Sequence, residues 1–485
     1  MVYRGKPSKS CRECRRRDIK CDKKKDSCSQ CSRAGLSCPG YSNPRDLVIL
    51  NETAATTEKV MRRRSLQCQH PPNPLSTVLL PTVFQRAKQL YISQYVEDTP
   101  PAAGLFSYMQ VFHPSTQHDF PLLETVVNAI FMATFSSLHG SRPALYDAQV
   151  GYGLALSLTR KAIESPKEAK LDRTLFSILL MSVFERLAIS EHEGFNIRNG
   201  HLRGAFELMF LRGSGQFTNK SGNAMFLHLT ELVILDCLAN ELDIPSQFLT
   251  LKRKALESGM DTSSIRWKFL EAMLQYAQLE SYISWSFAAA EIAIYRAEIL
   301  DSVLNQISRR FPSFISKRQN PEPLCVLEGR SDIYPDYDTH RCWNNIRVVR
   351  ILLARIIREQ CTQLLGTSTD DTLIMGKLHE SNRRIMSLCS DIILSIPCPG
   401  AREKLSYNIL SIRSSTLLFH LHVAKEIASP SGEIRLSIDK RLQYLKGRQS
   451  PARQRIMDCL LDGSQKVPNN VWKVWLKIGR EDYSI

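Results

Sequence analysis

Six cysteines within residues 11–38 constrain this chain more than any other sequence feature. Their spacing is C-x2-C-x6-C-x6-C-x2-C-x6-C, and the second three repeat the first three at a constant offset of 17 residues. The six positions are Cys11, Cys14, Cys21, Cys28, Cys31 and Cys38. Ile19 and Leu36 are equivalent apolar positions in this repeat. We therefore predict two similar halves, each a short helix and an extended strand, packed with Ile19 near Leu36.

The repeat also includes a pattern typical of helix starts. Ser10 and Glu13 match a capping box, in which a serine hydroxyl and a glutamate three residues later satisfy the first backbone N–H groups of a helix. Ser27 and Gln30 repeat this pattern in the second half. The sequence therefore predicts a serine-capped helix in each half.

The cysteines are expected to bind metal rather than to form disulfides. Residues 1–10 do not resemble a signal peptide, and we expect no membrane span because there is no run of about 18 uncharged apolar residues. The protein should therefore be intracellular, where thiols stay reduced. Structural zinc takes four ligands in a tetrahedron. Six thiolates satisfy two zinc ions if two of them bridge, and the symmetry of the repeat suggests that the bridging pair are equivalent residues.

Positive charge is concentrated around these cysteines. Residues 1–45 hold 13 basic and 4 acidic side chains, which is +9 of the net charge of +16 on the whole chain. Two zinc ions and six thiolates would lower the charge of this module only to about +7. A dense basic patch on a small module is the electrostatic footprint of nucleic-acid binding. A solvated polybasic tail is the alternative that charge alone leaves open.

The segment Cys11-Arg-Glu-Cys14-Arg-Arg-Arg-Asp-Ile-Lys-Cys21-Asp22 resembles the fungal binuclear zinc-cluster family. The resemblance implies two zinc ions held by all six cysteines, with Cys11 and Cys28 as the bridging thiolates. It also implies binding of double-stranded DNA at GC-containing, CGG-like sites in the major groove. A different zinc module and a disulfide-bonded or metallothionein-like cluster are the alternatives.

The two halves of the repeat differ in charge. The first half carries five cations between its cysteines, namely Arg12, Arg15, Arg16, Arg17 and Lys20. The equivalent positions in the second half are Ser29, Ser32, Arg33, Ala34 and Ser37. Arginine and lysine donate hydrogen bonds to guanine O6 and N7, and other basic side chains hold phosphates. We therefore predict that the first half enters the DNA groove.

One residue of the first half departs from the family pattern. Lysine usually follows the arginine run in the family and reads bases, but here the residue is Asp18. An acid could accept a hydrogen bond from a cytosine amino group, or orient Arg15 or Arg17 through a salt bridge. Our hypothesis is that Arg17 or Lys20 takes over guanine reading and that the preferred DNA sequence is shifted.

Two short basic runs follow. Lys23, Lys24 and Lys25 lie between the two halves and are predicted to contact phosphates, with a solvated loop as the alternative. Three arginines at positions 62–64 form the second run. Either run can serve nuclear import, so we expect the protein in the nucleus.

The remainder of the chain has the texture of a linker followed by helices. Residues 46–81 contain several prolines and no sustained heptads, so we expect a monomer or a homodimer formed without a coiled coil. Apolar residues then fall at helical spacing, for example in residues 84–95, 175–183 and 346–357. We predict three domains: a zinc cluster at 1–45, a linker at 46–81 and an all-helical regulatory domain at 82–485.

A second, looser resemblance supports a regulatory role for the large domain. The stretches Asp172-Arg-Thr-Leu-Phe176, Phe184-Glu185, His201-Leu-Arg-Gly-Ala205 and Leu211-Arg212-Gly213 resemble the large regulatory domain found beside fungal zinc clusters. The resemblance implies a helical, non-catalytic domain. We expect His201 and Arg212 to be structural, with binding of an effector as the alternative.

No pattern in the sequence indicates catalysis. The eight cysteines outside the cluster include no C-x2-C pair, and the chain contains no HExxH, P-loop, G-x-G-x-x-G or G-x-S-x-G pattern. We therefore expect no enzyme activity, although an enzyme with a nucleic-acid anchor is a third hypothesis.

The favoured function is sequence-specific transcription regulation. We expect a factor that acts at RNA polymerase II promoters with the transcription machinery as a partner, and that controls a metabolic pathway or a biosynthetic gene cluster. The alternative is a zinc-bearing protein-interaction or RNA-binding protein without sequence-specific DNA binding. Residues 10–38 contain no aromatic side chain on which bases could stack, which disfavours RNA.

Overall fold

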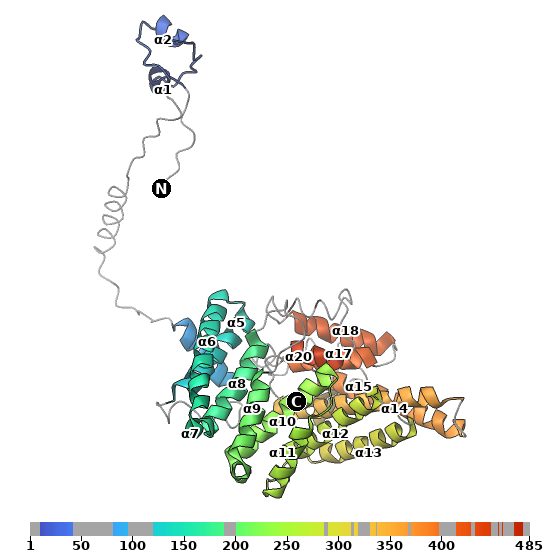
Figure 1. Ribbon diagram of the computed structural model, residues 1–485. Helices are drawn as coiled ribbons and strands as arrows, with labels where there is room; N and C mark the ends of the chain where they lie inside the picture. Colours follow the sequence, from blue (N-terminus) through green and yellow to red (C-terminus); the bar gives the residue numbers. More distant parts are fainter. Residues whose placement is uncertain are drawn as a thin grey trace. The chain divides into compact units, whose positions relative to one another are not determined.

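A computed structural model shows two compact units, Met1–Leu80 and Pro81–Ile485, each with its own core (Figure 1). The structure describes residues 10–41, 81–95, 120–188, 200–285, 290–311, 315–318, 330–335, 337–366, 370–396, 414–427, 432–447, 454, 458 and 470–478. The predicted linker, apart from Pro81, and the arginines at 62–64 lie outside these residues.

The small unit has two single-turn helices and an interior of sulfur. Helix α1 spans Arg12–Arg16 and α2 spans Ser29–Arg33. Its buried core consists of five of the six cysteines, with Cys38 and Tyr41 packed against them. Within residues 10–41 no strand forms, so the prediction of an extended strand in each half was wrong. The segments after each helix are held by the helix ends and the cysteines instead of by strand pairing.

The large unit is built almost entirely from helices. They are α4 Val83–Tyr95, α5 Pro121–His139, α6 Arg142–Glu164, α7 Pro166–Ala169, α8 Asp172–Ala188, α9 Gly200–Arg212, the 3-10 helix η2 Ser214–Thr218, α10 Lys220–Asn240, α11 Ser246–Glu257, α12 Ile265–Trp285, α13 Ala290–Ser308, α14 Tyr337–Leu364, α15 Asp371–Ser395, α17 Ser414–Ile427, α18 Gly432–Lys446 and α20 Val471–Ile478. The predicted helical fold class is confirmed.

A small sheet interrupts the helices and was not predicted. Strands β1 (Ile315–Arg318) and β2 (Arg330–Ile333) pair antiparallel, with Ile315 opposite Ile333. Each strand has four residues, which is too short for an alternating pattern to stand out from the surrounding sequence.

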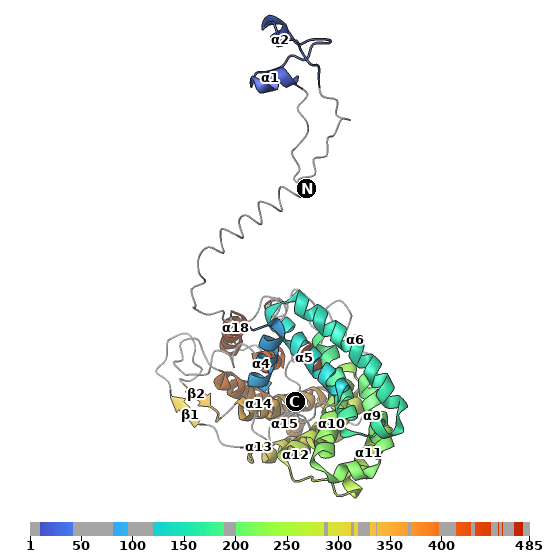
Figure 2. The same cartoon turned by 90° about the vertical axis from the view of Figure 1, so that its left-hand side faces the viewer.

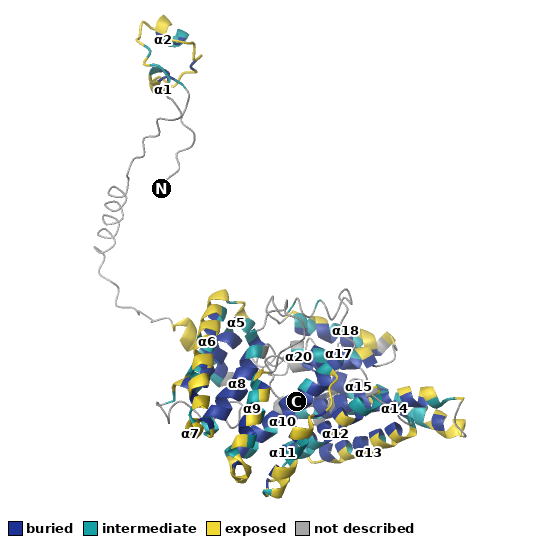
Figure 3. Cartoon of the chain, viewed as in Figure 1, coloured by how far each residue is buried: buried dark blue, intermediate teal, exposed yellow. Residues whose placement is uncertain are grey.

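The helical periodicity seen in the sequence corresponds to buried faces. In α8, Leu175, Ile178, Leu179 and Val183 are all buried, and α14 buries most of the apolar residues between 346 and 357. These faces supply much of the continuous dark interior of the helical unit (Figure 3). Burial of such side chains contributes roughly 1.5–3 kcal/mol each and is the main stabilising term for helices of this kind.

Pro143, Gly213 and Pro245 fall at helix ends. Pro143 lies in the first turn of α6, where proline needs no N–H partner, and Pro245 is the N-cap of α11. Gly213 separates α9 from η2 and has a φ of 74°, which favours glycine.

Successive helices pack on one another, and the last described helix returns to the middle of the unit. Helix α5 contacts α4, α6 and α8, and α6 runs along the outer edge with α5 on its inner side (Figure 2). Helix α20 contacts α10 and α17. Asn470, just before α20, donates a hydrogen bond from Nδ2 to the Leu238 carbonyl near the end of α10 (2.8 Å). The Trp472 ring packs against Phe419 of α17, with ring centroids 5.8 Å apart. Helix α20 therefore closes the core.

Two helices of this unit, α5 and α10, are long and apolar enough to cross a membrane by length and composition. Of the 18-residue apolar stretch in each helix, 61% in α5 and 78% in α10 is buried inside the protein. A mostly buried core helix of a soluble protein passes the same criteria. The expectation that the chain has no membrane span stays a prediction.

Candidate zinc centre and nucleic-acid interface

Both short helices begin at a cysteine. Cys11 is the N-cap of α1, and its Sγ accepts a hydrogen bond from the Cys14 N–H (3.4 Å). Cys28 caps α2 in the same way, with its Sγ accepting from the Cys31 N–H (3.4 Å). The prediction of serine caps was therefore wrong by one residue. The sulfur takes the place of the usual capping oxygen, so each helix start holds two sulfur atoms close together.

The 17-residue repeat extends to the backbone. The Ile19 N–H donates to the Cys14 carbonyl at 3.0 Å, and the Leu36 N–H donates to the Cys31 carbonyl at the same distance. Ile19 and Leu36 are 37% and 38% exposed, so sulfur rather than this apolar pair fills the interior. The two halves are thus copies of one local structure.

Asp18 occupies a left-handed backbone position in this local structure. Its φ is 53°, and the equivalent residue of the second half is Gly35, with a φ of 64°. Among residues other than glycine, aspartate is one of the few that adopt this conformation readily. The side chain is exposed, and within the described residues it forms no ion pair with Arg15 or Arg17. The alternative in which Asp18 orients one of these arginines gains no support from the structure.

The six sulfur atoms form two overlapping groups of four. One group is Cys11, Cys14, Cys21 and Cys28, the other is Cys11, Cys28, Cys31 and Cys38, and the sulfur atoms of each group all lie within 4.8 Å of one another. The Sγ atoms of Cys11 and Cys28 are 3.7 Å apart, and those of Cys14 and Cys28 are 3.6 Å apart. Sulfur atoms bound to one tetrahedral zinc at 2.3 Å are separated by about 3.8 Å. The arrangement fits two zinc ions that share two thiolates.

The cysteines differ in how readily their thiols ionise. Burial raises the pKa of Cys14, and the hydrogen-bonded Cys28 side chain raises the pKa of Cys31 to about 12. By contrast, the backbone N–H groups of Cys28 and Gly40 lower the pKa of Cys38 to about 7. Several thiolates so close together require cations between them. We therefore expect metal binding and folding of this unit to be coupled.

The predicted DNA-contacting cations all lie on the surface of the small unit. Exposed side chains include Arg12, Arg15, Arg16, Arg17, Lys20, Lys23, Lys24 and Lys25. Arg16 Nη2 lies 3.0 Å from Glu13 Oε2, one turn back on α1. Such an exposed pair contributes little to stability, so phosphate or a base can compete for the guanidinium.

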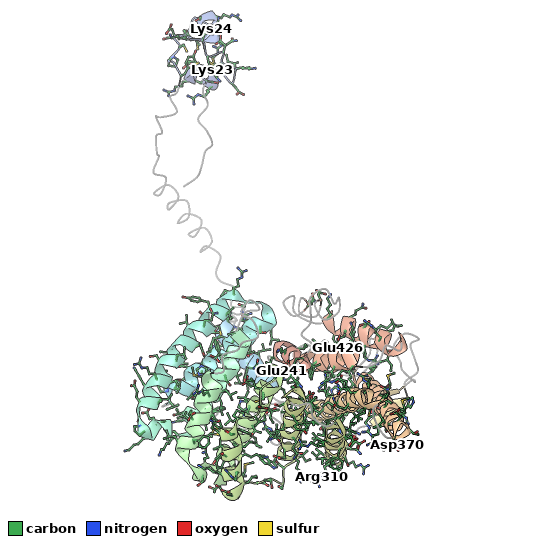
Figure 4. All side chains as sticks on the ribbon, turned by 45° about the vertical axis from the view of Figure 1, so that its right-hand side comes forward. Lys23, Lys24, Glu241, Arg310, Asp370 and Glu426 are labelled. Carbon is green, nitrogen blue, oxygen red and sulfur yellow. The ribbon has the colours of Figure 1, made fainter. Side chains whose placement is uncertain are left out.

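Two residues outside the predicted site support the loop between the halves. This loop carries Lys23 and Lys24 (Figure 4). The Asp22 carboxylate accepts a hydrogen bond from the Ser29 N–H at the start of α2 (3.1 Å), and the hydrogen bond from Ser29 lowers the pKa of Asp22. The Tyr41 hydroxyl donates to the Lys24 carbonyl. Tyr41 stands three residues after the last cysteine, a position that a search for charged or metal-binding residues passes over.

The residues of the looser resemblance have structural roles in the helical unit. The Tyr152 hydroxyl of α6 donates to Glu185 Oε1 of α8 (2.8 Å) and lies 2.7 Å from His201 Nε2 of α9. These bonds tie three helices together. Arg212 at the end of α9 forms an ion pair with Asp172 at the start of α8. Such contacts join helix ends and fit the structural role expected for His201 and Arg212.

A cavity of about 520 Å³ is lined mainly by α15, with Glu298 of α13 and Ile357 of α14, and half of its lining residues are charged. Its charges are largely paired with one another, as Lys377 with Glu298 and Arg384 with Glu380. Ser381 lines the cavity, but its hydroxyl donates to the Leu378 carbonyl of its own helix (2.8 Å).

Residues 9–47 match the family model of the fungal Zn(2)-Cys(6) binuclear cluster domain. No curated protein and no solved structure matches the chain. The match covers the whole small unit that the structure describes, and the large helical remainder is consistent with such a protein. Domains of this family are typical of DNA-binding transcription regulators, and their cofactors are two zinc ions. The chain therefore carries, at residues 9–47, a zinc- and DNA-binding domain of the fungal Zn(2)-Cys(6) binuclear cluster family.

Proposed function

We propose that this protein is a nuclear, sequence-specific transcription factor that acts at RNA polymerase II promoters and controls a metabolic pathway or a biosynthetic gene cluster. The observation that carries the proposal is the arrangement of the six sulfur atoms, which fits two zinc ions. Of the two halves around these sulfur atoms, only the first has a strongly basic surface. In this proposal residues 1–45 bind DNA, residues 46–81 are a linker and residues 82–485 regulate rather than catalyse.

All six cysteines are proposed as zinc ligands, with Cys11 and Cys28 bridging. Their membership in both sulfur groups supports this assignment. The same two sulfurs accept the helix-capping N–H bonds, and such bonds stabilise thiolates. Bridging thiolates also hold α1 and α2 at a set separation, which gives the first half a rigid frame on which to present its cations.

The first half is proposed to lie in the major groove and to read GC-containing, CGG-like sites. Arginines and the lysine of this half would donate to guanine, while Lys23, Lys24 and Lys25 would contact phosphates. Support comes from the exposure of these side chains and from the two hydrogen bonds that hold the loop. A fluorescence-anisotropy titration with a site selected from random DNA tests the proposal, with scrambled DNA and single-stranded RNA as competitors. Equal competition by RNA would favour the alternative of an RNA-binding protein.

Arg16 and Arg33 are a matched pair for testing which half contacts DNA. They occupy equivalent positions of the repeat, and each is the exposed last residue of its helix. We expect Arg16→Ala to weaken binding to the selected site by about 10- to 100-fold, the range for one specific arginine contact. Arg33→Ala should change the Kd by less than about threefold, as for a residue outside the interface. Equal losses in the two variants would assign the contact to both halves and contradict the proposal.

Asp18 is expected to shape the DNA preference. Asp18→Lys should change the preferred triplet in a binding-site selection, because it replaces an acceptor with a donor at the groove-facing end of α1. Asp18→Gly is the control, since Gly35 shows that glycine suits this backbone conformation. That variant should keep two zinc ions and bind non-specific DNA several-fold more tightly, because an acid near phosphates is removed. An unchanged preference in Asp18→Lys would refute the role.

A further inference from the structure

Helix α6 buries its small residues and exposes its large apolar ones, which is the reverse of an ordinary surface helix. The side facing α5 and α8 carries small residues, and its buried positions are Ala144, Ala148, Ala155, Thr159 and Ala162. Gly151 belongs to the same side and lies so close to α5 that an added Cβ would meet the Ala129 Cβ at 3.3 Å. The helix therefore sits close against its neighbour without using large side chains.

The large apolar side chains of α6 face solvent instead. They are Tyr146 (68% exposed), Val150 (56%), Leu154 (54%), Leu156 (43%) and Ile163 (48%). Figure 3 shows the exposed residues along α6 in the helical unit. Residues 148–159 contain no charged side chain at all. Single exposed apolar residues are ordinary, but Val150, Leu154 and Leu156 share one uncharged stripe between Asp147 and Arg160, and such a stripe marks an interaction surface.

The pattern of this stripe is complementary to itself in an antiparallel pair. Asp147, Leu154 and Lys161 are seven residues apart and therefore lie along one line of the helix surface. A twofold axis near Leu154 places Asp147 opposite Lys161 of a second copy at both ends of the line, and Leu154 opposite Leu154. Both charged side chains are exposed, and within the described residues neither forms an ion pair.

The remaining exposed positions fit the same axis. Leu156 lies on the opposite edge of the stripe and would meet its own counterpart in the second copy. Gly153 and Ser157 lie between the two edges, so small side chains occupy the centre, where two helices approach most closely. Arg160 is 84% exposed and paired only with Glu164 one turn on, a weak contact that leaves it free to adjust.

We propose that α6 is a homodimerisation surface on which two copies of this chain pack antiparallel about Leu154. The proposal is independent of the zinc centre, because it rests on the helical unit alone. A twofold-symmetric contact is the commonest way in which identical chains associate, and it requires a surface that is complementary to itself.

Sedimentation velocity of the full-length zinc-loaded protein over a concentration series tests the proposal. The wild type should be a dimer. Leu154→Glu should raise the dimer Kd at least about 100-fold, because it buries two facing acids at the axis. Leu373→Glu, on α15, is the matched control: this leucine is 56% exposed and its substitution should leave the dimer intact. Unchanged thermal unfolding of both variants would show that the fold is retained.

A charge exchange tests the orientation. Asp147→Lys and Lys161→Asp should each weaken the dimer about fivefold or more, and the double variant should restore wild-type affinity. Within one chain the two residues are about 21 Å apart along the helix, so rescue requires a second copy. A monomeric wild type, an unaffected Leu154→Glu dimer or failure of the double variant to restore affinity would each overturn the proposal.

Discussion

Removal of zinc from the full-length protein is expected to unfold the N-terminal unit and to abolish specific DNA binding. The interior of this unit is made of cysteine sulfur, and the large apolar residues Ile19 and Leu36 are over a third exposed. Without the metal, no apolar core remains to hold α1 against α2. In small zinc modules the free energy of metal binding, roughly 10–16 kcal/mol, is largely the free energy of folding.

The experiment combines chelation with two readouts. Zinc released on thiol modification should amount to two ions per chain, and anisotropy should show loss of binding to the selected DNA site. The far-UV circular dichroism of the helical unit should be nearly unchanged, because that unit has a separate core. Re-addition of zinc should restore binding. A metal-free protein that still recognised its site would contradict both the zinc assignment and the proposed function.

A cysteine substitution separates the site from a general effect of thiol loss. Cys14→Ser should have the effect of chelation, because Cys14 belongs to one sulfur group and its loss leaves that zinc with three ligands. Cys389→Ala is the control. Cys389 is buried in α15 of the helical unit and its thiol donates only a long hydrogen bond, at 3.8 Å to the Ala424 carbonyl. This variant should bind two zinc ions and DNA as the wild type does.

Gly222→Ala is expected to produce the second large effect, in the helical unit. Gly222 lies in the first turn of α10 and packs directly on the backbone of η2. An added Cβ would stand 1.8 Å from the Gln216 carbonyl oxygen and 2.8 Å from its carbon, both of which are backbone atoms. The Gly222 N–H also donates to the Asn219 side chain that caps α10 (2.6 Å). Gly222 cannot move away from Gln216 without breaking the hydrogen bond by which Asn219 caps α10.

The Gln216 side chain prevents the 3-10 helix from shifting away. Its amide donates to the Met209 carbonyl of α9 at 2.6 Å and to the Gly213 carbonyl at 2.7 Å. We therefore expect Gly222→Ala to lower the free energy of unfolding by about 3 kcal/mol or more, the range of severe overpacking. Urea denaturation followed by circular dichroism measures the change.

Gly376→Ala in α15 is the matched control for this substitution. Gly376 is also helical, and an added Cβ would meet nothing within 4 Å. It should stabilise the protein by roughly 0.5–1 kcal/mol, because alanine loses less backbone entropy than glycine in a helix. If Gly222→Ala changed the free energy of unfolding as little as Gly376→Ala does, η2 would be able to move away from α10 and the prediction would be wrong.

Much of the zinc centre was predictable because it depends on ligand number. Six cysteines with a 17-residue repeat predicted two zinc ions, and the overlapping sulfur groups agree with that count. The helix starts were not predicted correctly. Ser10 and Glu13 match a capping box, but the helix begins one residue later, where the buried Cys11 Sγ accepts from the Cys14 N–H.

The helices of the large unit differ in how well sequence patterns specify their buried faces. In α8 and α14 large apolar residues at helical spacing are the buried ones, as predicted. In α6 the same reasoning selects the wrong face, because both sides of the helix are apolar and the small residues are the ones packed on α5. Which side turns inward depends on the space beside Ala129, a property of the neighbouring helix.

By itself, then, the six-cysteine repeat determined the metal, its stoichiometry and the basic half of the module, because ligand count and charge are properties of the linear chain. Tertiary structure decided the rest. It made the cysteines the helix caps, placed Asp18 in a left-handed turn equivalent to Gly35, and turned the large side chains of α6 to the outside. These features depend on which groups compete for the same space and the same hydrogen bonds once the chain is folded, and that competition is not visible in the order of the residues.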